Sequence, residues 1–106
     1  MAKTYTDQVY SGTGATTVAT VVTVAASTTF VMKGFAISNA NAADKKFELL
    51  IDDKRILPYL KEIPTGDTLI RSDLNIPVTT GKTIKVKSEV ASDMDYYIWG
   101  VNEVTS

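Results

Sequence analysis

The sequence predicts an all-β protein, folded as a single antiparallel β-sandwich of about seven or eight strands in a jelly-roll-like or Greek-key order. Three observations indicate this class. Short runs of apolar and β-branched residues recur along the 106 residues, and such runs suit pleated strands. Turn-forming residues separate the runs at nearly regular intervals. No long window carries the 3.6-residue periodicity of an amphipathic helix.

Two regions are expected: a polar N-terminal segment, residues 1–14, and a β-sandwich domain over residues 15–106. The first segment closes on Ser11-Gly12-Thr13-Gly14 and is expected to be an arm or an edge strand. A frayed terminus is one reading of it, because chain ends are often poorly ordered. Docking of the segment onto a neighbouring subunit is the other.

The domain begins with a segment, residues 15–25, that consists almost entirely of Thr, Val and Ala. Since β-branched residues are stiff and suit a pleated surface, we expect a strand there.

A second strand is expected over residues 29–39, with Val31, Phe35 and Ile37 on one face. Gly34 within it indicates a bulge or a close approach of another part of the backbone. The small, turn-favouring residues 39–44 are expected to form an exposed loop that crosses between the sheets.

Residues 47–78 are the centre of the predicted fold, because they hold three apolar runs and two turn signals. Phe47, Leu49 and Ile51 alternate with other residues, as a half-buried strand requires. A polar turn, Asp52-Asp53-Lys54, leads to a second apolar run over residues 56–60. This run contains Pro58, which lacks a backbone donor and so favours a sheet edge.

The next turn, Pro64-Thr65-Gly66-Asp67, offers Pro for a preset φ and Gly for a positive one. Leu69 and Ile70, and then Leu74, Ile76 and Val78, resume the strand pattern. A third turn is expected at Thr79-Thr80-Gly81.

Two clear alternations close the chain. Ile84 and Val86 are expected to point inward, while the lysines that alternate with them project into water. The closing strand, residues 96–104, places Tyr97 and Trp99 on the same face. One face of a sheet is therefore expected to be aromatic.

The composition argues against several classes of protein. Without Cys the chain has no disulfide framework, thiolate metal site or Cys nucleophile. Without His it lacks the commonest general base and the commonest metal ligand. Eleven basic and twelve acidic residues give a net charge of −1, without the excess of Lys and Arg that tracks a phosphate backbone. We therefore expect no enzymatic activity, no metal or other cofactor and no nucleic-acid partner.

The hydrophobic segments are short. None reaches the roughly 20 apolar residues that span a bilayer, and the N-terminus lacks the apolar core of a secretory signal. We expect no membrane partner, and synthesis and use without export.

Carboxylates are the remaining chemical candidates. A glycosidase needs two of them placed together, but the spacing singles out no pair, and strand ends, turns and wet faces favour surface charges. Asp52-Asp53 and Asp93-Met94-Asp95 could ligate Ca²⁺, although turns favour Asp in any case. The carboxylates of the central region are Glu48, Asp52, Asp53, Glu62, Asp67 and Asp73.

Aromatic residues suggest an alternative function. Tyr59, Tyr97 and Trp99 could form a flat platform on which a sugar ring stacks, as in a carbohydrate-binding module. Packing within the core is the other use of such residues.

Four pieces of the sequence occur in a characteristic order: Ile37-Ser38-Asn39-Ala40-Asn41-Ala42-Ala43, Ile56-Leu57-Pro58, Pro64-Thr65-Gly66-Asp67 and Gly81-Lys82-Thr83-Ile84-Lys85-Val86-Lys87. Together, from about Val18 to Val104, they resemble the small β-sandwich proteins that tailed bacteriophages build into their virions. The resemblance is a pattern of turns and strands, and fold-level analogy alone does not fix a function.

The resemblance implies a non-enzymatic virion structural protein, most of all a capsid decoration or cement protein that acts by adhesion. A neck, tail or baseplate accessory subunit is the alternative within the same class. Its partners would be further copies of itself, as a homo-oligomer, and other virion proteins such as the major capsid protein. Its location would be the virion, after synthesis in the host cytoplasm.

With such a role, we expect the contacts in the N-terminal segment and in the apolar run near Pro58. The residues expected at these contacts are Tyr5, Val9, Tyr10, Ile56, Leu57, Pro58, Tyr59, Leu60 and Ile63.

Overall fold

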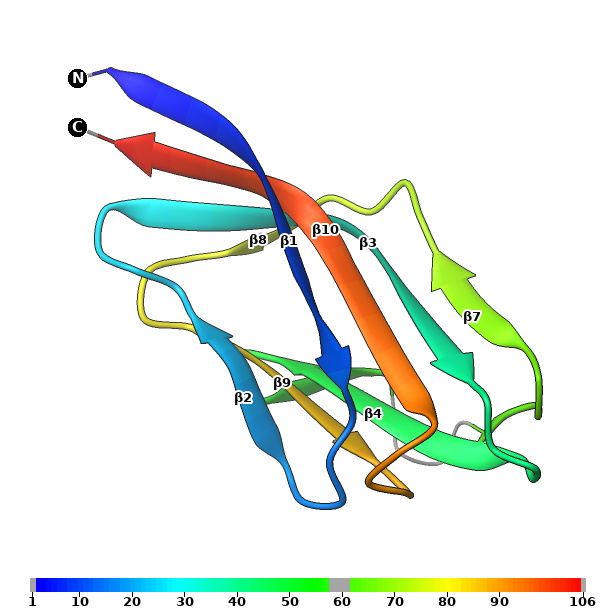
Figure 1. The fold of residues 1–106 in the computed structure, drawn as a ribbon. Coiled ribbons are helices and arrows are strands. Elements are labelled where there is room, and N and C mark those ends of the chain that lie inside the picture. Colours follow the sequence, from blue (N-terminus) through cyan, green and yellow to red (C-terminus); the bar gives the residue numbers. More distant parts are fainter. Residues whose placement is uncertain (1, 58–61, 106) are drawn as a thin grey trace.

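The computed structural model describes residues 2–57 and 62–105, which form strands and the connections between them, with no helix (Figure 1). Ten strands occur in these residues. They are β1 (Lys3–Thr13), β2 (Ala19–Thr23), β3 (Thr28–Asn39), β4 (Lys45–Ile51), β5 (Lys54–Leu57), β6 (Glu62–Ile63), β7 (Thr68–Arg71), β8 (Ile76–Val78), β9 (Thr83–Ser88) and β10 (Met94–Thr105).

The strands form two antiparallel sheets. The first sheet has the order β1-β10-β3-β7, with β8 also pairing with β3, and the second has the order β2-β9-β4-β5, with β6 also pairing with β4. Strands β7 and β8 both pair with β3, and β5 and β6 both pair with β4, so each of these pairs fills one position in its sheet. The ten strands therefore fill eight positions. About seven or eight strands were predicted, and the described residues form ten.

Numbered in chain order, the eight positions occur as 1-8-3-6 in the first sheet and as 2-7-4-5 in the second. This is the order of a jelly roll, in which two four-stranded layers interleave along the chain. The prediction of an all-β antiparallel sandwich is confirmed, and the strand order selects the jelly roll over other Greek-key arrangements.

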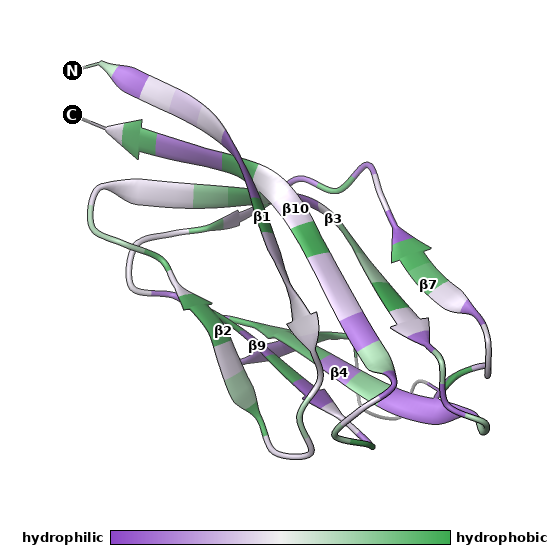
Figure 2. Ribbon diagram, in the orientation of Figure 1, coloured by the Kyte–Doolittle hydropathy of each residue, from purple (hydrophilic) through white to green (hydrophobic). Residues whose placement is uncertain are grey.

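The core lies between the two sheets. Strand β3 contributes Phe30 and Phe35, and β4 and β9 contribute Phe47 and Ile84 from the opposite layer, all of them buried. Figure 2 shows apolar bands along β10 separated by paler and hydrophilic residues, and the buried residues Met94, Ile98 and Gly100 share one face of the strand. The inward position predicted for Ile84 and Val86 is confirmed.

A bulge interrupts β3 opposite β10. Trp99 pairs with Gly34 and Gly100 with Met32, so Lys33 is an extra residue. The bulge expected at Gly34 is thus confirmed, but the face assigned to this strand is partly wrong. An extra residue reverses the alternation, so Phe35 and Ile37 point inward while Val31 lies on the other side with partial exposure.

Strand β4 is buried on both faces, contrary to the prediction of a half-buried strand. Phe47, Leu49 and Ile51 are buried as expected, but Glu48 and Leu50 are buried too. Leu50 lies between Lys85 of β9 and Arg55 of β5 in the sheet. The long stems of such side chains can cover an apolar neighbour while their charges reach water.

Glu48 corrects the expectation that the carboxylates of the central region are all solvated. Its side chain is only 6% exposed, and Arg55 Nε lies 2.6 Å from Glu48 Oε1. A buried carboxylate requires such a partner. The Glu48 carboxylate is therefore paired with the Arg55 guanidinium and not with a second carboxylate.

The first strand of the predicted domain is shorter than expected, because β2 covers only residues 19–23. The chain passes from the first sheet to the second between β1 and β2. Backbone hydrogen bonds hold this crossing, from Gly14 N to Met94 O at 2.8 Å and from Ser88 N to Ala15 O at 2.7 Å.

The predicted turns are present. Asp52 and Asp53 have φ of 53° and 59° and join β4 to β5 as a two-residue hairpin of the type that needs positive φ at both positions. Gly66 and Gly81 also have positive φ. The loop after Asn39 crosses from the first sheet to the second, as predicted.

Candidate interaction surfaces

The first sheet turns one side away from the second sheet, and we call this side the outer face. The strand register sets rows of side chains across it. One row holds Ser11, Tyr97, Ala36 and Ile70, from β1, β10, β3 and β7. Further rows, toward the chain termini, pair Val9 with Trp99, join Asp7, Val101, Val31 and Pro77, and pair Tyr5 with Glu103.

The outer face is unusually apolar for a surface. Seven large hydrophobic side chains are exposed among the described residues. Four of them lie on this face: Tyr5, Val9, Ile70 and Tyr97, with exposed fractions of 63%, 42%, 57% and 48%. Trp99, Val101 and Val31 are partly exposed between them. Apolar side chains gathered in this way, rather than scattered, mark an interaction surface.

Trp99 lies close against the backbone of the neighbouring strand. A Cβ atom added to Gly34 would meet Trp99 Cζ2 at 2.3 Å, so the indole ring covers the glycine. The rings of Tyr97 and Trp99 have centroids 6.1 Å apart and an interplanar angle of 47°. These two aromatic side chains therefore form a tilted pair on the surface, outside the core.

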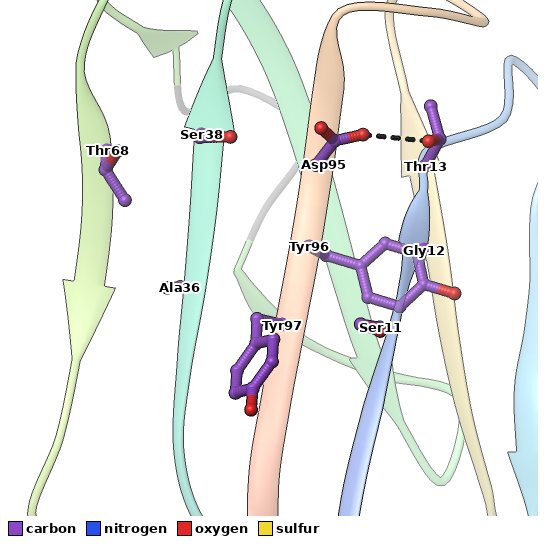
Figure 3. Close-up of a pocket in the computed structure, with 9 residues that line it drawn as sticks. All are labelled: Ser11, Gly12, Thr13, Ala36, Ser38, Thr68, Asp95, Tyr96 and Tyr97. Carbon is purple, nitrogen blue, oxygen red and sulfur yellow. Dashed lines mark hydrogen bonds between the residues drawn. The ribbon is translucent and has the colours of Figure 1, made fainter.

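A shallow hollow of ≈ 360 Å³ lies beside Tyr97 (Figure 3). Figure 3 shows the Tyr97 ring directed away from Asp95, and the Thr13 hydroxyl donates a hydrogen bond to Asp95 Oδ1 at 2.8 Å. The hollow is lined by Ser11, Gly12, Thr13, Ala36, Ser38, Thr68, Asp95, Tyr96 and Tyr97.

A second hollow, of ≈ 400 Å³, opens on the same face nearer to the termini. Tyr5, Val31, Pro77 and Val101 give it an apolar lining, and Lys33, Asn75 and Glu103 complete it. The Lys33 ammonium donates a hydrogen bond to Asn75 Oδ1 at 2.9 Å. We call the line of exposed apolar side chains on the outer face, Tyr5, Val9, Tyr97 and Ile70, the apolar strip. The outer face is thus uneven, with a hollow at each end of this strip.

Strand alternation places the three residues of the N-terminal segment that were expected at contacts on opposite faces of β1. Tyr5 and Val9 lie exposed on the outer face. Tyr10 points to the inner side, where its ring meets Phe30 edge-on with centroids 5.2 Å apart. Partial burial raises the pKa of the Tyr10 phenol, and a hydrogen bond with Asn102 partly offsets this.

The residues expected near Pro58 also have different environments. Ile56 is 41% exposed on β5, at an edge of the second sheet. Leu57 and Ile63 are buried in the core, so their side chains contact the protein itself. Pro58, Tyr59 and Leu60 lie outside the described residues. Tyr59 is also one of the three residues expected to stack on a sugar.

The outer face includes residues that the sequence did not single out, chiefly Ile70, Val31 and Pro77. Ile70 could have been placed by alternation, because Leu69 before it is partly buried against the core. Val31 could not, since its side depends on the bulge at Lys33.

The described residues hold neither a cluster of metal ligands nor a membrane-spanning helix. No cluster of three or more carboxylates that could hold a metal ion occurs in residues 2–57 and 62–105. Asp52 and Asp53 instead lie near lysines, with Lys82 Nζ 3.4 Å from Asp52 Oδ1 and Lys85 Nζ 2.7 Å from Asp53 Oδ1. Within the same residues there is no helix long and apolar enough to cross a membrane.

Comparison with known proteins gives structural likenesses but no match to a family model or a curated sequence. A solved structure described as "Cyanophage Pam1 capsid asymmetric unit" contains a similar chain, with a TM-score of 0.42 and 14% identity, over 98% of this chain and 84% of that one. A likeness of this size assigns no activity and no role to any residue here.

Proposed function

We propose that this protein is a non-enzymatic structural component of a bacteriophage virion, most specifically a capsid decoration or cement protein that binds neighbouring subunits. A neck, tail or baseplate position is the alternative within the same class. The partners are further copies of this chain and other virion proteins such as the major capsid protein.

The observation that carries the proposal is the apolar outer face. Tyr5, Val9, Ile70 and Tyr97 stand exposed on one rigid sheet, where their burial by a partner costs little backbone entropy. In a shell built from many equivalent positions, a modest contact per copy is repeated by symmetry and adds up. Ile56, at the edge of the second sheet, is a proposed second contact.

The sequence pattern from Val18 to Val104 supports the same class, since it resembles small virion proteins of tailed phages. The jelly roll serves both viral capsid and lectin domains, so the fold alone supports a virion protein and a sugar-binding module equally. The apolar content of the outer face favours adhesion to protein.

The direct test is the composition of the particle. Virions of the phage that encodes this chain should be purified to homogeneity, and their proteins quantified by mass spectrometry. We expect this protein in many copies per particle, in a fixed ratio to the major capsid protein. Its absence from intact particles would overturn the proposal.

A surface variant tests the outer face itself. Ile70→Asp places a charge in the exposed row with Tyr97 and should reduce binding of purified protein to particles that lack it at least tenfold. Val18→Asp, at a residue 50% exposed outside the outer face, is the matched control and should bind normally. Equal binding by both variants would exclude the outer face as the adhesive surface.

A carbohydrate-binding module is the second candidate. It is favoured by the exposed Tyr97 ring, which lines the same hollow as the Thr13 hydroxyl and the Asp95 carboxylate, since aromatic faces stack on sugar rings while polar groups bind their hydroxyls. A bound sugar should quench the fluorescence of Trp99, and Tyr97→Ala should abolish the effect. A panel of host-surface glycans without any change in emission would eliminate this candidate.

A further inference from the structure

Strand β1 is less protected against pairing with another chain than the other edge strands of the two sheets. Sheet edges commonly carry short strands, bulges, Pro or charges that discourage pairing with another chain. The short edge strands β5 and β7 have four residues each, β8 has three and contains Pro77, and β2 has five and a register shift. Strand β1 has eleven residues, no Pro and an unbroken register with β10.

The hydrogen bonds of β1 show which groups are available at this edge. Gly14 N donates to Met94 O at 2.8 Å, in register with the β1–β10 ladder. Because hydrogen-bonded pairs alternate along antiparallel strands, the even-numbered residues of β1 bond to β10. The odd-numbered residues, including Lys3, Tyr5 and Asp7, direct their N–H and C=O groups to the free edge.

The first half of β1 is also accessible from both sides. Residues 2–7 are all exposed, whichever face they occupy, and the molecule is elongated, 51 × 23 × 18 Å. Figure 1 shows the ends of β1 and β10 together, extending beyond the second sheet. Another chain can approach this edge without meeting the second sheet.

We propose that a second copy of this chain pairs with the free edge of β1, antiparallel and about a two-fold axis at Tyr5. The interface then consists of residues 3–7 from each copy. Lys3 of each copy lies opposite Asp7 of the other, so that the register brings two pairs of opposite charges together. This inference deepens the proposed function and rests on it for the biological use of the dimer.

Neighbouring registers fit less well. An axis at Asp7 would place two carboxylates directly opposite each other, which is destabilising. Axes at Thr6 or Gln8 would use the outward carbonyl of Val9, where the second strand would have to share this acceptor with Gln8 Nε2, which donates to it at 3.2 Å. With the axis at Tyr5, that carbonyl lies beyond the paired residues.

Lys3 can serve both copies. Its ammonium lies 2.7 Å from Glu103 Oε1 of its own chain, and an ammonium has three donors. The Glu103 hydrogen bond and charge raise the pKa of Lys3, so the positive charge is kept. Asp7 is exposed on the same face and supplies the partner carboxylate.

The pairing has a structural consequence. A two-fold axis perpendicular to the sheet keeps both outer faces on the same side, so the apolar strip of one copy continues into that of the other. Five residues per strand give a weak contact in isolation. The dimer is therefore expected only at high concentration, or where a lattice holds the copies together.

Charge reversal and mixing test the register. Asp7→Lys should place two ammonium groups opposite each other across the axis, and Lys3→Asp should oppose two carboxylates. Each variant alone should therefore dimerise roughly tenfold more weakly than the native chain. An equimolar mixture of the two restores opposite charges at both pairs and should dimerise like the native protein. Lys54→Asp, exposed on β5, is the control and should leave dimerisation unchanged.

Sedimentation equilibrium up to about 1 mM measures these states, because contacts with Kd near 1 mM are then detectable. A native chain that remains an 11.5 kDa monomer throughout, or variants whose mixture fails to recover dimerisation, would overturn the inference. A monomer that is nevertheless abundant in virions overturns only the pairing, whereas a dimer absent from virions contradicts only the proposed function.

A backbone variant tests strand pairing independently of charge. Tyr5→Pro removes an N–H that faces the free edge, so it should abolish the dimer while the melting temperature falls little. Thr6→Pro removes an N–H that bonds to β10 and should lower the melting temperature sharply. If Tyr5→Pro dimerises like the native chain, pairing through this edge is excluded.

Discussion

At the scale of single residues, Gly34 decides where the aromatic surface forms. It follows the extra residue of the β3 bulge, and its missing side chain leaves room for the indole of Trp99. The bulge thereby sends Val31 outward and keeps Phe35 inward. Gly34 therefore affects both which β3 side chains reach the core and which side chains lie on the outer face.

Gly34→Ala should displace Trp99. The added Cβ would lie 2.3 Å from Trp99 Cζ2 and 2.7 Å from the backbone oxygen of Arg71, so we expect a loss of about 1–3 kcal/mol of stability and a more exposed indole. The chain has a single Trp, so its emission reports this directly as a shift to longer wavelength.

Gly66→Ala is the control for that experiment. It adds a Cβ with no atom within 4 Å at a φ of 73°, so it should destabilise through backbone strain alone and leave the emission of the folded state unchanged. Identical emission spectra for both variants would show that the position of the Trp99 indole does not depend on Gly34.

Asn39 is a buried polar residue whose side chain holds the loop between the sheets. Its Nδ2 donates to Ala43 O at 3.0 Å and to Ile63 O at 2.8 Å, and its Oδ1 accepts from Asn41 N at 2.8 Å. Asn39→Ala would remove all three hydrogen bonds and leave the buried Ile63 carbonyl without this donor, so it should lower the free energy of unfolding, measured in urea, by about 3 kcal/mol. Asn41→Ala, which is less buried, should cost clearly less, and equal losses would contradict this role.

At the scale of elements, the β4–β5 hairpin is determined by its two-residue turn. Positive φ at Asp52 and Asp53 suits a turn whose twist matches that of the strands, and Asp tolerates such φ values better than most residues. Both carboxylates also face lysines of the neighbouring segment, Lys82 and Lys85. Local backbone preference and surface charge therefore favour the same hairpin.

Asp53 gives the hairpin a dependence on acid pH. The hydrogen bond and charge of Lys85 lower the pKa of Asp53 below its usual value of 3.8, so the folded state favours the ionised form. This contribution is present above the unfolded pKa and is lost as pH falls through the lowered pKa. Asp53→Asn, which tolerates the same φ, should be slightly less stable than the native chain at pH 6.

Thermal unfolding from pH 6 to pH 2 measures this effect. The difference in melting temperature between the native chain and Asp53→Asn should shrink as the pH falls below 3.8. A difference that stays constant over this range would show that the Asp53 charge does not contribute.

At the scale of the whole molecule, the jelly-roll order makes each layer depend on the other. The chain passes repeatedly between the sheets, and the first and last strands, β1 and β10, are neighbours. The core side chains of β3 therefore pack against β4 and β9 of the other layer. Neither sheet has a separate core on which to fold alone.

Unfolding should consequently be a single cooperative transition. Fluorescence of Trp99 reports the first sheet, and far-UV circular dichroism reports all strands, so their urea midpoints should coincide. Refolding should be slow, in the range of milliseconds to seconds, because the strand pairings are distant in sequence. A fluorescence transition that clearly precedes loss of circular dichroism would show that the sheets unfold separately.

The pattern of residues along the chain was enough to predict the fold class, most of the turns and the inward positions of Ile84 and Val86, because turn residues and period-2 alternation act locally. It also placed Tyr97 and Trp99 on one face. These features need only the residues near them in the chain.

Four features emerge only in the folded chain: the strand order, the side on which Val31 lies, the burial of Glu48 beside Arg55 and the assembly of Tyr5, Val9 and Ile70 on one surface with Tyr97. Each of these depends on which distant strands pair and in what register. Alternation defines two faces of a strand, but the bulge at Lys33 and the neighbours across the sheet decide which of them meets the core.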